Sequence, residues 1–246
     1  MLGRQLRRSL AVTEKDIRIY YLKGPVLIFG ILFPMFLFLA FSVGRSIPIE
    51  VMISGLLSMT LFFTATAVSP IILPWEGNMG TLERLISAPV SIPAILLGDA
   101  LASFIFGIVI SLVPIGFGLL LGVRILSPFV LAAAILLSAF CFSYLGTLFS
   151  TPPTNVPSNI MMISNLFKFP LVFISGIFMP LEQMPSWGRM VSLFSPLTYL
   201  TDLMRYSILG ISYYPILLDF AAIVLFTAIF MALAMVIHMK NMPKRL

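Results

Sequence analysis

Few side chains in this 246-residue chain are of the types that perform catalysis or bind metals, and those few are scattered. The chain has one histidine, His238, and one cysteine, Cys141, which disfavours a zinc site, an intrachain disulfide and a nucleophile–histidine–carboxylate triad. We interpret Cys141 as a small packing residue and His238 as a structural one. The G-x-x-x-x-G-K-[ST] motif that holds nucleotide phosphates is also absent from the sequence. We therefore expect no enzyme activity in this chain, no metal and no cofactor.

Charged side chains near the long apolar runs are the next candidates for chemistry. Ion-coupled carriers commonly use ionisable groups near the middle of the bilayer. Here Asp99 is interpreted as a solvated or capped carboxylate at the cytoplasmic interface, with a transport group as the alternative. Lys168 is interpreted as a side chain that reaches back to the lipid head groups, with a position lining a transport pathway as the alternative. This pattern disfavours an ATP-independent secondary carrier, which remains the alternative because backbone carbonyls alone can bind sodium. The acidic residues at the ends of the runs or in loops are Glu50, Glu76, Glu83, Asp99, Glu182, Asp202 and Asp219.

The stretch GNMGTLERLISAPVS, residues 77–91, places Glu83 and Arg84 between two apolar runs. Asn78 or Thr81 is expected to cap a short helix, with Glu83 in its first turn, where the helix dipole favours an anion. Pro74 is expected to end the preceding apolar helix, and the pair Ser91-Ile92 with a following proline to start the next one. The stretch is therefore predicted to form a separate short helix in a cytoplasmic loop.

One face of this short helix is apolar, because Leu82, Leu85 and Ile86 follow the helical spacing i, i+3, i+4. Pro89 limits its length to about two turns, which is too short for a stable isolated helix. The helix must therefore pack on something. Its own helix bundle is one alternative, and a cytoplasmic partner that docks on it is the other.

Composition places most of the chain in lipid, since 60% of the residues are hydrophobic and only 10% are charged. A transmembrane helix needs about 20 mainly apolar residues. Six runs approach that length, and we expect an all-α polytopic membrane protein with six transmembrane helices. The predicted spans are 26–43, 52–73, 101–122, 129–149, 161–180 and 215–237.

Basic residues predict the orientation of the spans. They concentrate in both terminal tails, so we place both termini in the cytoplasm of a multi-pass protein of the cell membrane. The net charge of +6 then reflects topology and contact with anionic lipid head groups, and nucleic acid is not an expected partner. The basic residues of the tails are Arg4, Arg7, Arg8, Lys15, Arg18, Lys23, Lys240, Lys244 and Arg245.

The first 24 residues have the pattern of an amphipathic helix that lies in the membrane surface. An apolar face is formed by Leu6, Leu10, Ile17 and Tyr20, and Glu14 can pair with Arg18 at i, i+4. A topology anchor and a contact surface for a partner are equally good interpretations of this helix. The loop at 150–159 contains three prolines and no charge, and it predicts a stiff turn.

Residues 181–214, between the last two predicted spans, contain two short amphipathic helices. The first presents an apolar face, and the second, 196–208, starts at Ser195-Pro196 and ends at Gly210. Asp202 and Arg205 are expected to pair at i, i+3. The two helices form either a re-entrant pair or a surface loop on lipid. The apolar faces are Trp187, Met190, Val191 and Phe194 on the first helix, and Leu197, Leu200 and Met204 on the second.

Two of these segments together resemble the permease subunits of ATP-binding-cassette transporters of the type 2 exporter family. GTLERLISAPVS, residues 80–91, resembles the Gly-Thr-Leu-Glu motif of that family. Residues 175–205 resemble its outer motif, through Pro180, Met184-Pro185, the Ser-Pro-Leu-Thr-Tyr run at 195–199, and Arg205. The topology agrees over essentially the whole chain, so the resemblance implies one permease domain over 1–246.

The resemblance implies a role for each marked segment. The 75–91 loop would carry a coupling helix that fits a groove on a separate ATPase subunit, which would bind and hydrolyse ATP. Residues 1–24 would be an interfacial helix, 181–214 would close the exit side, and two permeases would assemble with two ATPases. The implied coupling residues are Gly80, Thr81, Leu82, Glu83, Arg84, Leu85 and Ile86, and the implied outer-gate residues are Pro180, Pro185, Pro196, Tyr199 and Arg205.

Three function classes therefore stand at the level of sequence. The favoured one is the permease of an ATP-driven exporter, followed by the secondary carrier. An intramembrane enzyme or a passive scaffold is the third, and it fits worst because the chain lacks a nucleophile–base set and carries two specialised loop helices. Direction of transport follows from the resemblance alone, and the apolar spans do not distinguish among substrates.

Overall fold

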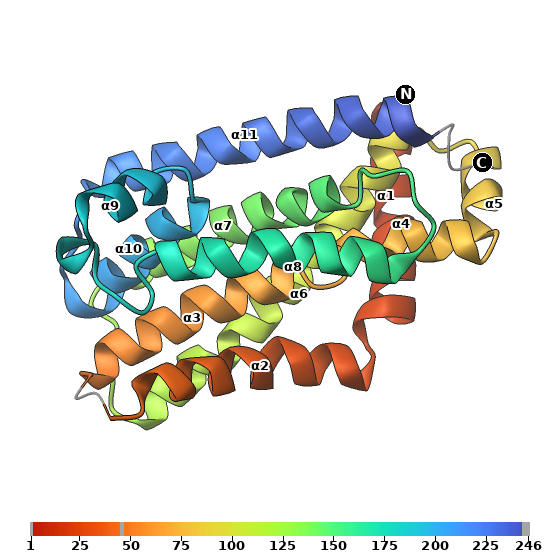
Figure 1. Ribbon diagram of the computed structural model, residues 1–246. Helices are drawn as coiled ribbons and strands as arrows, with labels where there is room; N and C mark the ends of the chain where they lie inside the picture. The colour runs from red at the N-terminus through yellow and green to blue at the C-terminus, as the bar shows by residue number, and fades with distance from the viewer. Residues whose placement is uncertain (1, 45–46, 243–246) are drawn as a thin grey trace.

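A computed structural model describes residues 2–44 and 47–242 of the chain, so that Lys244 and Arg245 of the basic tail lie outside the described residues. The described part is helical throughout, with turns and loops between the helices and no strand, which confirms the all-α prediction (Figure 1). The elements are α1 (Leu2–Asp16), the π-helix η1 (Ile17–Tyr21), α2 (Gly24–Ser42), α3 (Ile49–Ala65), α4 (Ser69–Asn78), α5 (Thr81–Ser87), α6 (Ile92–Leu120), α7 (Pro128–Phe149), α8 (Pro157–Ile174), the 3-10 helix η2 (Leu181–Gln183), α9 (Ser186–Ser192), α10 (Pro196–Leu209) and α11 (Ile216–Asn241).

Five stretches of the described chain are long and apolar enough to cross a membrane. They correspond to five of the six predicted spans, and α2, where we predict the first span, contains a shorter described apolar stretch at Gly30–Ala40. The prediction of a polytopic membrane protein is therefore confirmed, and the count of six spans stays a prediction. The five stretches are Ile49–Asn78, Ile92–Leu120, Pro128–Phe149, Pro157–Ile174 and Ile216–Asn241.

The long helices run alongside one another and separate two specialised ends (Figure 1). Helix α5 lies at one end, together with α1 and the C-terminal end of α11, and we call this the inner end of the bundle. Helices α9 and α10 lie at the other end. The two loop segments that the sequence marks therefore sit at opposite ends of the helix bundle. The side of the membrane that each end faces stays a prediction.

The second span is interrupted, and the break differs from the one we expected at Pro74. Helix α3 ends at Ala65, and α4 then continues to Asn78 with Pro74 inside it. The break falls earlier because Pro70 has no N–H to donate to the carbonyl of Thr66, four residues before it. Proline is tolerated within a membrane helix only where other groups satisfy the backbone that it frees.

Lys168 of α8 supplies the missing donor at this break. Its side chain is buried, with 4% of its surface exposed, and Nζ donates to the Thr66 carbonyl oxygen at 2.5 Å. The expectation that Lys168 reaches the lipid head groups is therefore wrong. An open carbonyl inside the bundle lies within reach of the amine, and a hydrogen bond is stronger where water is excluded.

This explanation predicts that Lys168 and Pro70 are energetically coupled. Lys168→Met should destabilise the protein by about 1–3 kcal/mol, because the Thr66 carbonyl loses its donor. Pro70→Ala returns an N–H to the chain at the position that can pair with this carbonyl, so Lys168→Met should cost about 1 kcal/mol less in that background. Thermal or denaturant unfolding of the four proteins in one detergent measures the coupling. Equal costs of Lys168→Met in both backgrounds would contradict the explanation.

Candidate functional site

Helix α5 forms about as the sequence predicts, but its start is different. The residue before its first turn is Gly80, whose φ of 67° lies in the left-handed region that glycine adopts without strain. Neither Asn78 nor Thr81 caps the helix as we expected: Asn78 ends α4, and the Thr81 hydroxyl donates to the Glu76 carbonyl at 3.3 Å. Because only Met79 and Gly80 separate α4 from α5, the chain has to turn sharply between them.

The apolar face of α5 packs on the inner end of its own bundle. Leu82 is 1% exposed and lies in a cluster with Leu73 of α4 and with Ile95 and Leu96 of α6. Leu85 and Ile86 are partly buried against the same cluster. Complete burial of a leucine contributes roughly 1.5–3 kcal/mol, so this contact stabilises a helix that is too short to persist alone. The predicted apolar face is thus confirmed.

The opposite face of α5 is open. The side chains of Glu83 and Arg84 are exposed, as is Thr81, and the Ser87 hydroxyl donates within the helix to the Glu83 carbonyl at 2.8 Å. The seven predicted coupling residues, Gly80 to Ile86, therefore divide into an apolar face that packs on the bundle and an exposed face that carries the charges. A protein contact through that face stays a prediction.

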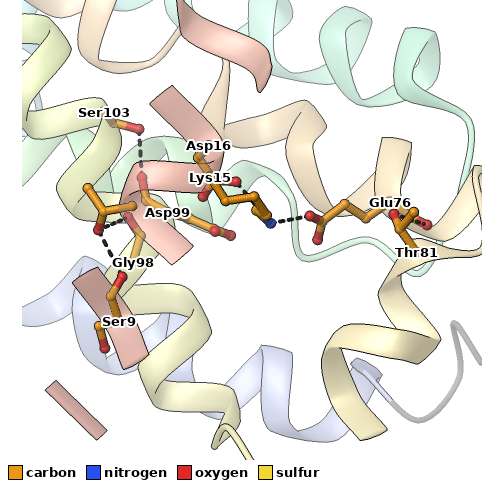
Figure 2. Close-up of polar contacts among 9 residues, drawn as sticks. Ser9, Lys15, Asp16, Glu76, Thr81, Gly98, Asp99 and Ser103 are labelled. Carbon is orange, nitrogen blue, oxygen red and sulfur yellow. Dashed lines mark hydrogen bonds and ion pairs between the residues drawn. The ribbon is translucent and has the colours of Figure 1, made fainter. Parts of the chain in front are cut away.

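Behind α5 lies a buried group of charged residues that comes from three different helices. We name it the inner charged cluster and define it as Lys15 and Asp16 of α1, Glu76 of α4, and Asp99 of α6. The Lys15 ammonium pairs with Asp16 Oδ1 at 3.0 Å and also with Glu76 Oε1 (Figure 2). This one amine therefore connects α1 to the inner end of the second span.

Asp99 is not the solvated or capped carboxylate that we expected. It is 1% exposed, and no N–H or O–H of the described residues donates to either of its oxygens. Helix α1 covers it, because α1 packs along α6 and places Asp16 beside it. The sequence pattern places Glu76 and Asp99 at span ends and does not connect them. Their common position on the inner side of two spans, with the Lys15-Asp16 pair on the same side, was the signal available.

Burial and the charges of the inner charged cluster change the pKa values of Lys15 in α1 and Tyr20 in η1. Burial lowers the pKa of Lys15, but the negative charges of Asp16, Asp99 and Glu76 together raise it above its ordinary value. Burial also raises the pKa of the Tyr20 phenol to about 12, with a further contribution from the Glu76 charge. Lys15 therefore carries a positive charge at neutral pH, and Tyr20 stays neutral.

Helix α1 reaches α6 through small residues. The Thr13 hydroxyl bonds to the carbonyls of Ser9 and Gly98, each at 3.0 Å. A Cβ atom on Gly98 would lie 2.6 Å from Val12 Cβ and 2.8 Å from the Ser9 carbonyl oxygen. Glycine at 98 is therefore required for the observed distance between the two helices.

The apolar face that we predicted for the first 24 residues is divided in the structure. Leu6 and Leu10 are 53% and 54% exposed, whereas Tyr20 is buried and Ile17 is partly buried in a cluster with residues of α4 and α6. Within α1, the residues buried against the bundle are Ser9, Val12 and Thr13. Ion pairing between Glu14 and Arg18 is confirmed, at 2.6 Å. The helix thus has one polar face on the bundle and a second, apolar face that is open, and its place in the membrane surface stays a prediction.

At the other end, α10 inserts among the ends of α3, α7 and α11. Leu197, Leu200 and Met204 are fully buried, which confirms the predicted inner face of this helix. The apolar face predicted for the shorter segment before it is exposed, since Trp187, Met190, Val191 and Phe194 all lie at the surface. The second helix is therefore largely enclosed by protein, whereas the first lies at the surface.

Two of the predicted outer-gate residues donate hydrogen bonds to backbone carbonyls of neighbouring turns, and the other three are prolines at the start of short helices. Tyr199 donates its hydroxyl to the Leu193 carbonyl at 2.9 Å, and Arg205 Nη2 donates to the Gly176 carbonyl at 2.5 Å. Pro180 precedes η2, Pro185 precedes α9, and Pro196 begins α10. Tyr199 and Arg205 thus tie α10 to two neighbouring turns, and the three prolines set where the short helices begin.

The expected pair of Asp202 and Arg205 does not form. The Asp202 carboxylate accepts hydrogen bonds from the backbone N–H groups of Tyr213 and Tyr214, at 2.8 and 2.7 Å, while Arg205 turns to Gly176. Each charged group therefore forms hydrogen bonds with backbone groups and not with the other side chain. Burial raises the pKa of Asp202 and lowers that of Arg205, although both shifts are opposed by neighbouring groups.

His238 and the proline-rich loop both have structural contacts at the inner end. His238 Nε2 lies 3.0 Å from the Thr147 carbonyl oxygen and 3.1 Å from the Ser150 hydroxyl, so it joins α11 to the end of α7. Residues 151–156 contain no helix, which agrees with the predicted stiff turn. Across the described ranges, no three His, Cys, Asp or Glu side chains are arranged to hold a metal ion.

Comparison with known proteins gives one family and one relative. Residues 9–209 match the family described as "ABC-2 type transporter". Over 160 residues the chain is 29% identical to "Putative transport permease ycf38" of Cyanophora paradoxa, an alignment that covers 62% of this chain and 53% of that relative. The aligned part therefore spans about half the length of the relative.

The close approach at Gly98 yields a testable expectation. Gly98→Ala should loosen α1 by about 1–3 kcal/mol, because the new methyl group collides with the Ser9 backbone. Gly116→Ala in the same helix is the matched control, since a Cβ there meets nothing within 4 Å. The measurement is the rate at which trypsin cleaves the Arg- and Lys-rich α1 in folded protein. Equal rates for the two variants would refute the packing argument.

Proposed function

Because the chain belongs to the ABC-2 type transporter family, we propose that it is the membrane permease of an ATP-driven exporter whose ATPase is a separate subunit. The chain is a multi-pass membrane protein, and its family and its relative support a transport permease. In this proposal the permease provides the path for the substrate, and the partner binds and hydrolyses ATP.

The observation that carries the proposal is the division of α5 into two faces. Leu82 anchors the helix in the bundle, and Glu83 and Arg84 project from it on the exposed side. A helix used only for internal packing would have no need of an exposed charged pair in a chain with 10% charged residues. Complementary charges on a partner would give this face orientation and specificity.

A push on α5 would be transmitted directly to the membrane helices. Only Met79 and Gly80 connect it to α4, and Thr81 is bonded to the Glu76 carbonyl at the end of that helix. The Leu82 cluster adds a second attachment, to α6. Motion of the partner would therefore move the inner ends of two spans together, as alternation between inward and outward openings requires.

The proposed outer gate is the segment 181–214, with Pro180, Pro185, Pro196, Tyr199 and Arg205 as its fixed points. Within this segment, the burial of α10 among α3, α7 and α11 supports a closure of the exit side. We further propose that both termini and α5 lie in the cytoplasm, at the cell membrane, and that two permeases assemble with two ATPases.

The first test of the proposal is the partner. We expect the tagged full-length chain, purified from its native membranes in mild detergent, to bring along an ATP-binding-cassette ATPase. Vesicles that contain both subunits should hydrolyse ATP in a substrate-dependent manner. Persistent absence of such an ATPase, with transport that follows an ion gradient without nucleotide, would overturn the proposal in favour of a secondary carrier.

The charged face of α5 gives a sharper prediction. Glu83→Arg combined with Arg84→Glu preserves net charge but should lower ATP-driven transport about tenfold or more, because like charges would then meet at the interface. Membrane insertion and thermal stability should not change, since both side chains are exposed. Arg124→Glu, which reverses an exposed charge in the loop after α6, is the control. Unaltered transport in the double variant would remove these side chains from the proposed role.

For the outer gate, the bond between Arg205 and Gly176 is the feature to test. Arg205→Leu should destabilise the protein by about 1–3 kcal/mol, because the Gly176 carbonyl loses its donor. The control is Arg189→Leu on α9, which removes a partly exposed cation from the same segment. Thermal unfolding and proteolysis of residues 181–214 measure the effect. If the two variants unfold at the same temperature and are cleaved at the same rate, the hydrogen bond from Arg205 does not hold this segment in place.

A further inference from the structure

The inner charged cluster contains more negative groups than its one cation can balance. Asp16 and Asp99 are 0% and 1% exposed, and Glu76 is also buried. Lys15 pairs with Asp16 and with Glu76, so a single ammonium group faces three carboxylates. Two uncompensated negative charges would remain on buried side chains if all three were ionised, which is a costly arrangement.

Apart from the Lys15 ammonium, which lies 3.0 Å from Asp16 Oδ1, neither aspartate carboxylate has a polar partner that donates to it. The other three carboxylate oxygens of Asp16 and Asp99 lack an N–H or O–H donor among the residues that the structure describes. The nearby hydroxyls donate elsewhere, those of Thr13 and Ser103 to backbone carbonyls of α1 and α6. A missing donor between two facing carboxyl groups is what one additional hydrogen would supply.

We propose that Asp16 and Asp99 share one proton and so form a proton-binding site that holds α1 against α6. One proton converts the repulsion between two carboxylates into a hydrogen bond, and it reduces the excess negative charge of the cluster. The site requires neither the ATPase nor a transported substrate, so its test is independent of the proposed function.

The groups that face the pair come from three other places in the fold. They are Lys15 on α1, Glu76 on α4, and the tyrosines of η1, of which Tyr21 lies with its hydroxyl 2.5 Å from Ser103 Oγ. Lys168, the buried lysine of α8, donates to the Thr66 carbonyl instead.

The position of the site links it to the rest of the inner end. Figure 2 shows Asp16 and Asp99 on one side of Lys15 and Glu76 on the other. Glu76 in turn offers its backbone carbonyl to Thr81, the first residue of α5. Loss of the shared proton would therefore weaken the contact between α1 and α6. This contact lies next to α5, the helix that we propose contacts the ATPase.

Infrared spectroscopy of the full chain in lipid nanodiscs tests the proposal directly. A protonated, buried carboxyl group gives a C=O stretching band that an ionised carboxylate lacks. Asp219 is another buried carboxyl without a hydrogen-bond donor, so the band is followed in protein that carries Asp219→Asn. We expect the band at neutral pH in that background, and its loss when either Asp16→Asn or Asp99→Asn is added. The matched control is Glu14→Gln, which changes an exposed carboxylate on the same helix and should leave the band in place.

A second measurement follows the consequence for α1. The shared proton stabilises the α1–α6 contact at low pH, and this stabilisation is lost as pH rises through the titration of the pair. Tryptic cleavage of α1, normalised to an unstructured peptide, should therefore accelerate with rising pH in the wild-type protein. In Asp99→Asn the amide is neutral at every pH and can donate to Asp16, so the acceleration should disappear.

Each measurement can overturn the proposal. A wild-type spectrum without the protonated-carboxyl band at neutral pH would do so, and this result needs no variant to fold. A band that the Asp219→Asn background retains when either Asp16→Asn or Asp99→Asn is added would also do so. Equal pH dependence of α1 cleavage in wild type and Asp99→Asn would remove the pair from the control of this contact.

Discussion

The inner end of this protein depends on one partly buried ammonium group, that of Lys15. Helix α1 contacts α6 mainly through small and polar residues, and its open leucines contribute nothing to that contact. The ion pair of Lys15 with Glu76 fixes α1 to the second span, whereas its pair with Asp16 lies within α1. Because both carboxylates are buried, salt screens these pairs less than it screens exposed ones, but the pairs persist only while the remaining negative charge of the cluster is balanced.

Two helix ends within the bundle are closed by another kind of contact. A long basic side chain crosses from a neighbouring segment and donates to a backbone carbonyl at the helix end. Lys168 does so at Thr66, in the broken span, and Arg205 does so at Gly176, after α8. Water is scarce at such places, so a side chain has to provide the hydrogen bond that a soluble protein would take from solvent.

These contacts give the proposed transport cycle a physical basis. Helix α5 is attached to the second span by two residues and to α6 by the Leu82 cluster, so it cannot move without them. At the opposite end, α10 is held by Tyr199 and Arg205 between turns and spans. The break at Thr66 lies within the second span, between these two ends, and a helix bends most easily at such a point.

Composition, proline positions and helical spacing were sufficient to determine the class of fold, five of the apolar helices, the two-turn length of α5 and the inner face of α10. These features depend on local preferences and on hydrophobic burial, both of which are written in short stretches of residues. The partners of Lys168, Asp99, Asp202 and Arg205 were not accessible in this way. Each of these groups bonds to, or is covered by, a segment that only the packing of helices brings near, and the strength of a charge depends on that surrounding medium. Only the tertiary structure therefore determined which groups these charged side chains contact.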